Sequence, residues 1–205
     1  MTTRRELLKL AGAGAAAASL RPTLALAAVP KAERPLRILI LGGTGFTGPH
    51  QVRYALARGH ELTLFNRGRR PREWPAPVEE LVGDRNTGNL EALAGREWDV
   101  CIDNPTTLPF WVRDAGQVLK GKVGHYVFIS TLSVYASEKE AGQDETAGLA
   151  VYKGQDAMKE TQETLRKDVE ALYGPLKALS EKEAEKWFPG ATTVVRPGLI
   201  VGPGD

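Results

Sequence analysis

Cysteine, histidine and long apolar runs are scarce in this sequence of 205 residues. Its single cysteine, Cys101, excludes an internal disulfide framework and any cysteine-based zinc finger. The three histidines, His50, His60 and His125, are too far apart to form a metal-ligand pattern, so no metal site is expected. No run of about 18 strongly apolar residues occurs, which excludes an ordinary membrane-spanning helix. The formal net charge of +2 is too small for a protein that coats nucleic acid, so no nucleic-acid partner is expected.

The composition is that of a folded protein of modest size. Hydrophobic residues make up 42% of the chain and charged residues 25%, which supplies enough apolar material for a packed core and excludes global disorder. A chain of this length accommodates one domain, or one domain and part of another.

The N-terminal residues differ from the rest in charge and composition. Residues 1–27 hold four basic residues and one acidic residue, followed by an Ala/Gly-rich stretch and a small-residue cleavage pattern. This order resembles a twin-arginine export signal, and the residues that carry the resemblance are Arg4, Arg5, Leu8 and Lys9. It implies the export machinery as a partner and a periplasmic or exported location, or a cytoplasmic one if the signal does not function. The alternatives are a loose alanine-rich helix or a misassigned start codon. Residues 28–35 are then a linker.

From residue 36 onward, short apolar runs alternate with helical patterns. We predict strands over residues 36–41, 61–65, 78–82, 98–103, 125–130 and 192–196, and helices over 46–58, 90–94, 110–119 and 177–187. A polar stretch breaks this rhythm and is expected to include a solvated helix over about residues 156–172. Strands that alternate with helices predict an α/β fold: a doubly wound parallel sheet of the Rossmann type, with helices on both faces, over residues 36–205.

Three glycines follow the first predicted strand and open the first helix. Gly42, Gly45 and Gly48 are spaced three apart. In a dinucleotide-binding loop the first glycine permits a tight turn, the second lets the backbone approach a pyrophosphate, and the third lets helix and strand pack closely. The helix N-terminus then offers free N–H groups to the phosphates. The alternative is a glycine-rich turn without a ligand. No Lys-Ser/Thr pair follows, so this is not the phosphate loop of a nucleotide hydrolase.

The end of the second predicted strand bears on the choice between NAD and NADP. Asn66 stands where an Asp or Glu would bind the adenosine ribose 2′-hydroxyl. Arg67, Arg69 and Arg70 follow, and a guanidinium at this place can pair with a 2′-phosphate. We therefore expect NADP to be preferred over NAD. The alternative is a solvated basic loop; nucleic acid is disfavoured because no aromatic series accompanies the arginines.

Several motifs together resemble one known family. They are the loop at residues 42–48 and the stretches at 83–85, 130–135, 173–177 and 196–205. In this order they are similar to the extended short-chain dehydrogenase/reductases, the NAD-dependent epimerase/dehydratase group. The resemblance covers residues 36–205 and implies an NAD(P)-binding Rossmann domain.

The resemblance also implies a catalytic set. Tyr173 and Lys177 are four residues apart and therefore share one face if they lie on one helix. Thr131 ends a predicted parallel strand, at the sheet edge where ligands bind. By resemblance, Thr131 orients the substrate oxygen, Tyr173 transfers the proton, and Lys177 favours the phenolate and holds the nicotinamide ribose. Ser130 or Ser133 could replace Thr131, and the alternative for Tyr173 and Lys177 is an ordinary exposed pair.

One proline constrains the helix that carries this pair. Pro175 fits only in a first helical turn, so the helix is predicted to begin close to Tyr173.

Other cofactor contacts follow from the resemblance alone. Asp84 meets the adenine, Asp103 and Asn104 lie beside the adenosine ribose, and Pro197 and Ile200 flank the nicotinamide. The full set of cofactor-binding residues implied is Gly42, Thr44, Gly45, Phe46, Thr47, Gly48, Asn66, Arg67, Asp84, Arg85, Asn104, Lys177, Pro197 and Ile200. The alternative for Asp84 is a turn cap, and for Pro197 the end of a strand.

The predicted function is an NAD(P)-dependent epimerase, dehydratase or reductase that acts on a hydroxyl or carbonyl of a small molecule, a nucleotide sugar among the candidates. The alternative is a dinucleotide-binding module without turnover, redox-sensing or RNA-associated. The sequence stops at Asp205 inside a motif that continues in relatives, so the C-terminal substrate-binding region is expected to be absent or truncated. A homodimer is a further possible assembly.

Overall fold

The described structure is built around one parallel sheet. The computed structural model describes residues 29–104, 107–137 and 141–202, and its secondary structure lies within one unit, Lys31–Asp205. The strands are β1 (Arg37–Leu41), β2 (Glu61–Asn66), β3 (Glu79–Val82), β4 (Trp98–Asp103), β5 (Val123–Ile129) and β6 (Thr192–Val195). They pair in the order β3-β2-β1-β4-β5-β6, every pair parallel. This is the strand order of the dinucleotide-binding Rossmann fold, and it confirms the predicted fold class.

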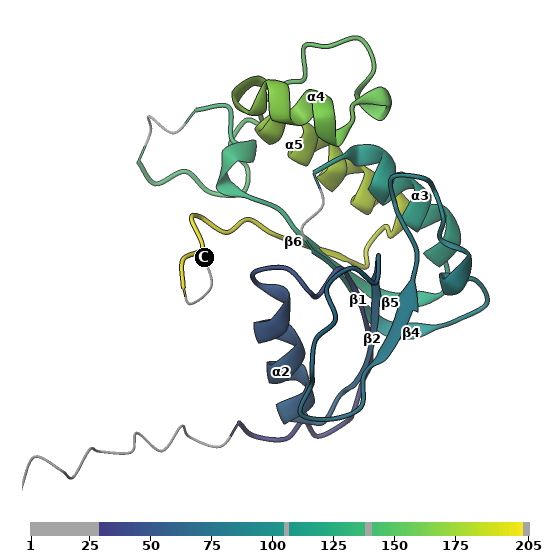
Figure 1. The fold of residues 1–205 in the computed structure, drawn as a ribbon. Coiled ribbons are helices and arrows are strands. Elements are labelled where there is room, and N and C mark those ends of the chain that lie inside the picture. Colours follow the sequence, from purple (N-terminus) through teal and green to yellow (C-terminus); the bar gives the residue numbers. More distant parts are fainter. Residues whose placement is uncertain (1–28, 105–106, 138–140, 203–205) are drawn as a thin grey trace, which may run out of the picture. The chain divides into compact units, whose positions relative to one another are not determined.

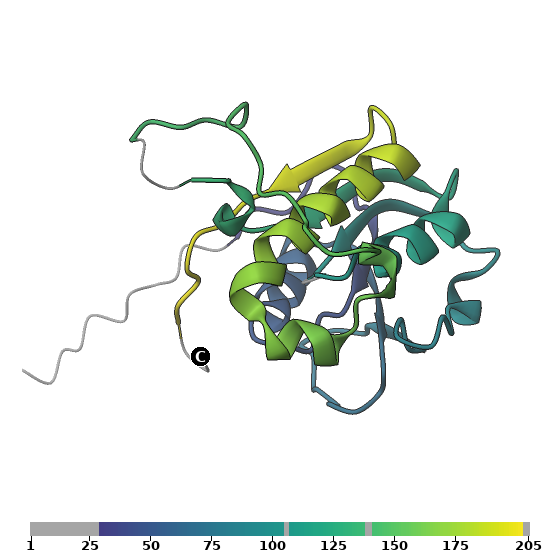
Figure 2. The same cartoon turned by 90° about the horizontal axis from the view of Figure 1, so that it is seen from above.

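Helices cover both faces of this sheet (Figure 1). They are α2 (Gly48–Arg58), α3 (Pro109–Leu119), α4 (Gln162–Lys167) and α5 (Val169–Trp187), together with the 3-10 helices η1 (Glu91–Leu93), η2 (Leu132–Val134) and η3 (Ala157–Lys159). The helix α2 lies on one face, and α3 and α5 pack side by side on the other (Figures 1 and 2). None of the helices in the described part of the chain is long and apolar enough to cross a membrane.

The central strand β1 is buried on both faces, which explains its unbroken apolar sequence. Ile38 and Ile40 pack in a cluster with α2, whereas Leu39 and Leu41 pack in the larger cluster below α3 and α5. The strand order reverses between β1 and β4. In open α/β sheets, ligands bind outside the carboxyl ends of the strands at such a reversal.

The polar stretch before α5 is less continuous than predicted. Instead of one helix over about residues 156–172, three helical pieces occur: η3, α4 and the first turn of α5. Each begins at a side chain that accepts from a backbone N–H: Asp156 from Met158, Thr161 from Thr164, and Asp168 from Ala171. Residues that cap a helix N-terminus start a new helix rather than continue the old one.

The start of α5 differs from the prediction as well. It begins at Val169, so Pro175 lies inside the helix and the expected start near Tyr173 is wrong. A proline there lacks the N–H that would bond to the carbonyl of Ala171. The helix persists because Leu172 and Leu176, on either side of the proline, pack in a cluster with Leu108. Tertiary packing thus outweighs the local cost of the proline.

The predicted export signal lies at residues 1–27, outside the described residues. The twin-arginine route and the exported location therefore stay predictions from the sequence.

Candidate functional site

The glycine loop connects β1 to α2 at the strand-order reversal. Gly42 has a φ of +108°, and a Cβ on it would lie 2.4 Å from the carbonyl oxygen of Asn104. A Cβ on Gly48 would lie 2.4 Å from the carbonyl of Gly43, so only glycine allows this close packing. At Gly45 a Cβ would meet no atom of the described residues within 4 Å, so the backbone there is open on the side where a Cβ would stand. The three glycines thus meet the three steric requirements from which a dinucleotide loop was predicted.

The N-terminus of α2 points out of this loop. Thr47 is the N-cap residue, and no side chain accepts from the first N–H groups of the helix. The Thr47 hydroxyl donates instead to Asn104 Oδ1 at 3.3 Å, and Asn104 Nδ2 donates to Gln51 Oε1 at 2.7 Å. Pro49 has no N–H and the His50 N–H donates to the Thr47 carbonyl at 3.2 Å, so this helix end offers an anion the Gly48 N–H and the positive end of the helix dipole.

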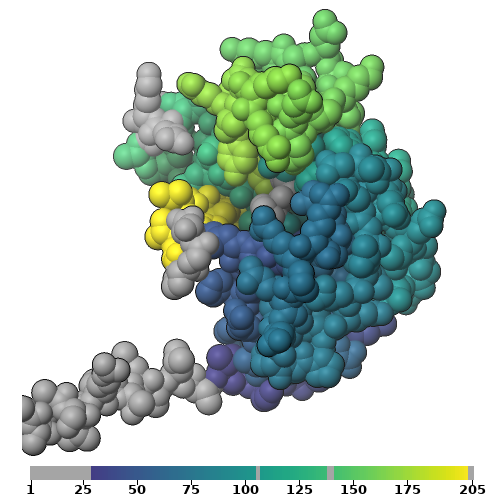
Figure 3. Space-filling view, viewed as in Figure 1, coloured from purple at the N-terminus to yellow at the C-terminus, as the bar shows by residue number. Residues whose placement is uncertain are grey.

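Two cavities meet at the loop and form one groove. The first cavity, about 500 Å³, extends over the ends of β2 and β3. The second cavity, about 590 Å³, extends over the end of β5 toward α5. Both are lined by Gly42, Gly45 and Asn104. In the space-filling view the surface is hollowed between the blue segment that carries the loop and the green segment of α4 and α5 (Figure 3).

The first cavity has a basic rim. Arg67, Arg69 and Arg70 line it, and none of them forms an ion pair with a described residue. Asn66 also lines it, but its Oδ1 accepts from Gly68 N–H at 2.7 Å and its Nδ2 donates to Glu80 at 3.3 Å. The three arginines therefore give this end of the groove positive charge that no ion pair with a described residue neutralises.

Asp84 and Thr44 line the first cavity from opposite sides. The Asp84 carboxylate accepts from the backbone N–H of Asn86 at 2.9 Å, so Asp84 does cap a turn, as its alternative predicted. The Thr44 carbonyl accepts from Arg72 Nη2 at 3.4 Å. Both residues lie at the groove where the resemblance puts them; their contact with a cofactor stays a prediction.

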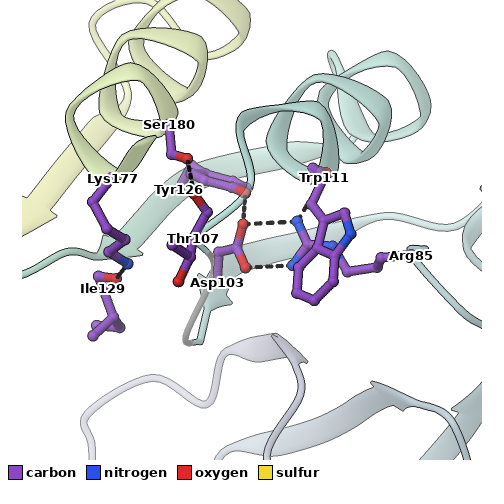
Figure 4. A network of polar contacts seen from close by, with 8 residues as sticks. All are labelled: Arg85, Asp103, Thr107, Trp111, Tyr126, Ile129, Lys177 and Ser180. Atoms are coloured by element: carbon purple, nitrogen blue, oxygen red, sulfur yellow. Dashed lines mark hydrogen bonds and ion pairs between the residues drawn. The ribbon is translucent and has the colours of Figure 1, made fainter. Parts of the chain in front are cut away.

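Beneath the first cavity lies a buried charge network (Figure 4). Arg85 donates to both oxygens of Asp103, at 2.6 and 3.0 Å, and Tyr126 OH donates to Asp103 Oδ2 at 2.5 Å. Burial raises the pKa of Tyr126 well above its ordinary value, so its phenol stays a donor. Asp103 is fully buried and does not line either cavity. Arg85 and Tyr126 thus already occupy the Asp103 carboxylate, and a place of Asp103 beside a ribose stays a prediction.

Trp111 lines the first cavity, although it was not singled out from the sequence. The Arg85 guanidinium lies over its ring, 5.3 Å from the centroid, and donates to its carbonyl at 2.9 Å. The indole Nε1 is buried and has no hydrogen-bond partner among the described residues. Its place in the first turn of α3, the helix that follows β4, is the sequence signal that could have pointed to it.

The second cavity brings together two of the three residues predicted to be catalytic. Thr131 and Tyr173 both line it, as do Phe46, Thr47, Pro197 and Ile200. Thr131 lies just past β5, and its Oγ1 accepts from Ser133 N–H at 3.2 Å. Thr131 and Tyr173 are distant in the sequence. They line the same cavity because the first turns of α5 pack against η2.

Lys177 does not line the second cavity. Its side chain is 1% exposed, its Nζ donates to the carbonyl of Ile129, and it lies 4.5 Å from the centroid of the Phe128 ring (Figure 4). Burial lowers the pKa of Lys177 to about 8. Lys177 thus lies under the end of β5, on the same helix as Tyr173 and four residues from it.

A second buried ion pair was not found from the sequence. Glu181 is 3% exposed, and Arg196 donates to both its oxygens, at 3.1 and 2.8 Å. Ser130 also donates to Glu181, so its hydroxyl is already used, and Ser133 is the serine that lies beside Thr131. The signal was present: Glu181 follows Tyr173 and Lys177 at the same spacing of four on α5.

Comparisons with known proteins agree with this geometry. Residues 38–104 match the NAD dependent epimerase/dehydratase family. A 2-alkyl-3-oxoalkanoate reductase of Stenotrophomonas maltophilia is 29% identical over 188 positions, which cover 83% of this chain and 52% of that protein. The chain therefore spans about half the length of this relative.

Solved structures show the same fold at low identity. A UDP-galactose 4-epimerase has a TM-score of 0.59 at 20% identity, covering 78% of this chain and 55% of its own. The enzyme WbmG of Bordetella bronchiseptica, in complex with NAD, has a TM-score of 0.61 at 14% identity, covering 80% and 53%. The UDP-glucuronic acid 4-epimerase of Bacillus cereus, in complex with NAD, has a TM-score of 0.59 at 16% identity, covering 82% and 58%.

Proposed function

We propose that the chain is an NAD(P)-dependent oxidoreductase of the epimerase/dehydratase group, acting on a hydroxyl or carbonyl of a small molecule. The observation that carries the proposal is the continuous groove: it runs from the arginine rim over the open backbone of Gly45 to the Thr131 and Tyr173 side chains. The family match over the glycine loop and the names of the relatives, an oxoalkanoate reductase and several epimerases, support the same chemistry.

The residues present fit a dinucleotide. The empty space at Gly45 and the uncapped N-terminus of α2 suit a diphosphate, and the unpartnered Nε1 of Trp111 is a donor beside the first cavity. When bound, a nicotinamide supplies hydride transfer. Under this proposal Thr131, which lines the second cavity, donates to the substrate oxygen, and Tyr173, which lines it too, gives a proton to that oxygen or takes one from it.

A Gly45→Val substitution is expected to weaken dinucleotide binding by about 10- to 100-fold without a loss of stability. The new side chain meets no protein atom within 4 Å but occupies the space a diphosphate would fill, a conflict of about 1–3 kcal/mol. Calorimetric titration with NAD and NADP measures the affinity, and urea unfolding measures the stability.

The matched control for this change is Gly148→Val, because Gly148 is equally open and lines no part of the groove. It should leave the affinity unchanged. Binding by Gly45→Val as tight as by the unmodified protein would contradict a diphosphate at this loop, and no uptake of either dinucleotide by the unmodified chain would overturn the proposed function.

NADP preference is a separate part of the proposal. An Arg67→Ala change should weaken NADP binding by about 10- to 100-fold, since a hydrogen bond to a charged group contributes about 1.5–3 kcal/mol, and should barely alter NAD binding. Arg53→Ala, an exposed arginine on α2 outside the groove, is the control. Equal losses for NAD and NADP would remove the preference; the neighbours solved with NAD make this a real alternative.

A binding module without turnover is the second candidate. It is favoured by one observation: Lys177 donates to the Ile129 carbonyl and does not line the second cavity, so it is not placed to hold a ribose there. Under this alternative the chain takes up NAD or NADP with normal affinity and no carbonyl or hydroxyl compound is turned over. A dinucleotide-linked absorbance change with any such compound excludes it.

A further inference from the structure

A third cavity, about 750 Å³, lies beside the second. Ser133 and Tyr173 line both cavities, so the third is reached directly from the hydroxyls of the proposed catalytic site. Its other walls are residues 135–136, 149–151 and 153–154 and the first two turns of α5. A molecule that presents an oxygen to Tyr173 would extend into this space.

The walls of the third cavity are held by backbone contacts. Ala150 N–H donates to the Val134 carbonyl at 2.7 Å, and Ala136 N–H donates to the Gly148 carbonyl at 2.8 Å. On the opposite side, α5 approaches η2 so closely that a Cβ on Gly174 would lie 2.1 Å from the carbonyl oxygen of Ser133. The walls of the third cavity are therefore held in place by hydrogen bonds and close backbone packing.

The lining of the third cavity is mainly aliphatic. It includes Leu149, Ala150, Val151, Val169, Leu172 and Pro175. Val151 is 73% exposed and Val169 is 52% exposed, so apolar surface that a ligand could bury is available there. Burial of this surface against an alkyl chain would be favourable, by about 0.8 kcal/mol for each methylene group.

Among the described residues, the charged ones in this lining are Lys153 and Glu170. No arginine of the described ranges lines the third cavity. A nucleotide sugar needs cations for its diphosphate, and here the charge of Lys153 is balanced by Glu170. The lining therefore suits an uncharged chain better than a diphosphate.

We propose, on the basis of the proposed function, that the third cavity binds the alkyl chain of a small carbonyl or alcohol substrate, and that nucleotide sugars are not substrates. The reacting oxygen lies at Thr131 and Tyr173 in the second cavity, and the chain runs past Ser133 along Val151 and Val169.

The experiment measures binding of 2-alkanones of increasing chain length to the full chain, with and without NADP. The dissociation constant should fall by about three- to fourfold for each methylene group until the cavity is filled. UDP-glucose should not displace the alkanone. Because this readout needs no turnover, it remains decisive even if the protein is a binding module.

Val151→Asp should flatten the dependence on chain length, since it puts a charge on the exposed apolar rim. The matched control is Val82→Asp, a 62% exposed valine on β3 that lines no part of the three cavities. An affinity independent of chain length, or displacement by UDP-glucose, would overturn this inference while leaving the dinucleotide site intact. Failure to take up NAD or NADP, with the chain-length dependence retained, would instead overturn the proposed function alone.

Discussion

A Tyr173→Phe protein is expected to lose dinucleotide-linked turnover by about 10²- to 10⁴-fold while it keeps its affinity for NAD(P). The change removes a single hydroxyl from a side chain that lines the second cavity, and the apolar contacts of the ring are retained. Only the proton transfer to or from the substrate oxygen is lost. The measurement is the nicotinamide absorbance change with a 2-alkanone or the corresponding alcohol, with kcat and KM determined separately.

Tyr54→Phe is the control for this substitution. Tyr54 lies on α2, is 56% exposed and lines no part of the groove, so its variant should keep full turnover. Turnover that survives Tyr173→Phe would show that another group moves the proton, and the Thr131 hydroxyl would then be the first alternative.

The sheet could be predicted from the sequence because its signals are local. The central strand β1 is a short apolar run that is followed at once by the glycine loop, so its predicted bounds of 36–41 differ from the observed strand by one residue. The roles of the three glycines are also local. Gly42 has a positive φ, Gly45 is open on the side of a Cβ, and Gly48 closely approaches the backbone of Gly43, all within one turn between β1 and α2.

The polar core of the site could not be predicted, because its partners are distant in the chain. Asp103 and Asn104 are neighbours in sequence, yet only Asn104 lines the groove. The Asp103 carboxylate is instead bound by Arg85 and Tyr126, which are distant from it in the chain. The same holds for Lys177, whose ammonium bonds to β5 because α5 packs over that strand. The spacing of a motif predicts which residues share one face of a helix. It does not predict which other element that face packs against.

An Asp103→Ala substitution is expected to lower the free energy of unfolding by about 3–5 kcal/mol, a large part of the 5–15 kcal/mol typical of a domain. The carboxylate is fully buried and accepts two hydrogen bonds from Arg85, so its removal leaves a buried guanidinium without its counter-charge. Urea unfolding measures the loss. Binding of NADP should weaken as well, since Arg85 and Trp111 form one wall of the first cavity.

Two further variants test whether uncompensated charge is the cause. Asp99→Ala, which breaks a half-exposed pair with Arg37 at 3.8 Å and a hydrogen bond from the Arg37 backbone N–H at 2.8 Å, should cost only about 1–2 kcal/mol. The double variant Asp103→Leu with Arg85→Met removes both buried charges and should recover at least half of the loss, because an apolar pair of similar volume often replaces a buried ion pair without cost. The part not recovered reflects the Tyr126 hydroxyl, which then lacks its acceptor. A double variant as unstable as Asp103→Ala would mean that packing around β4, not the charge pair, holds this side of the groove.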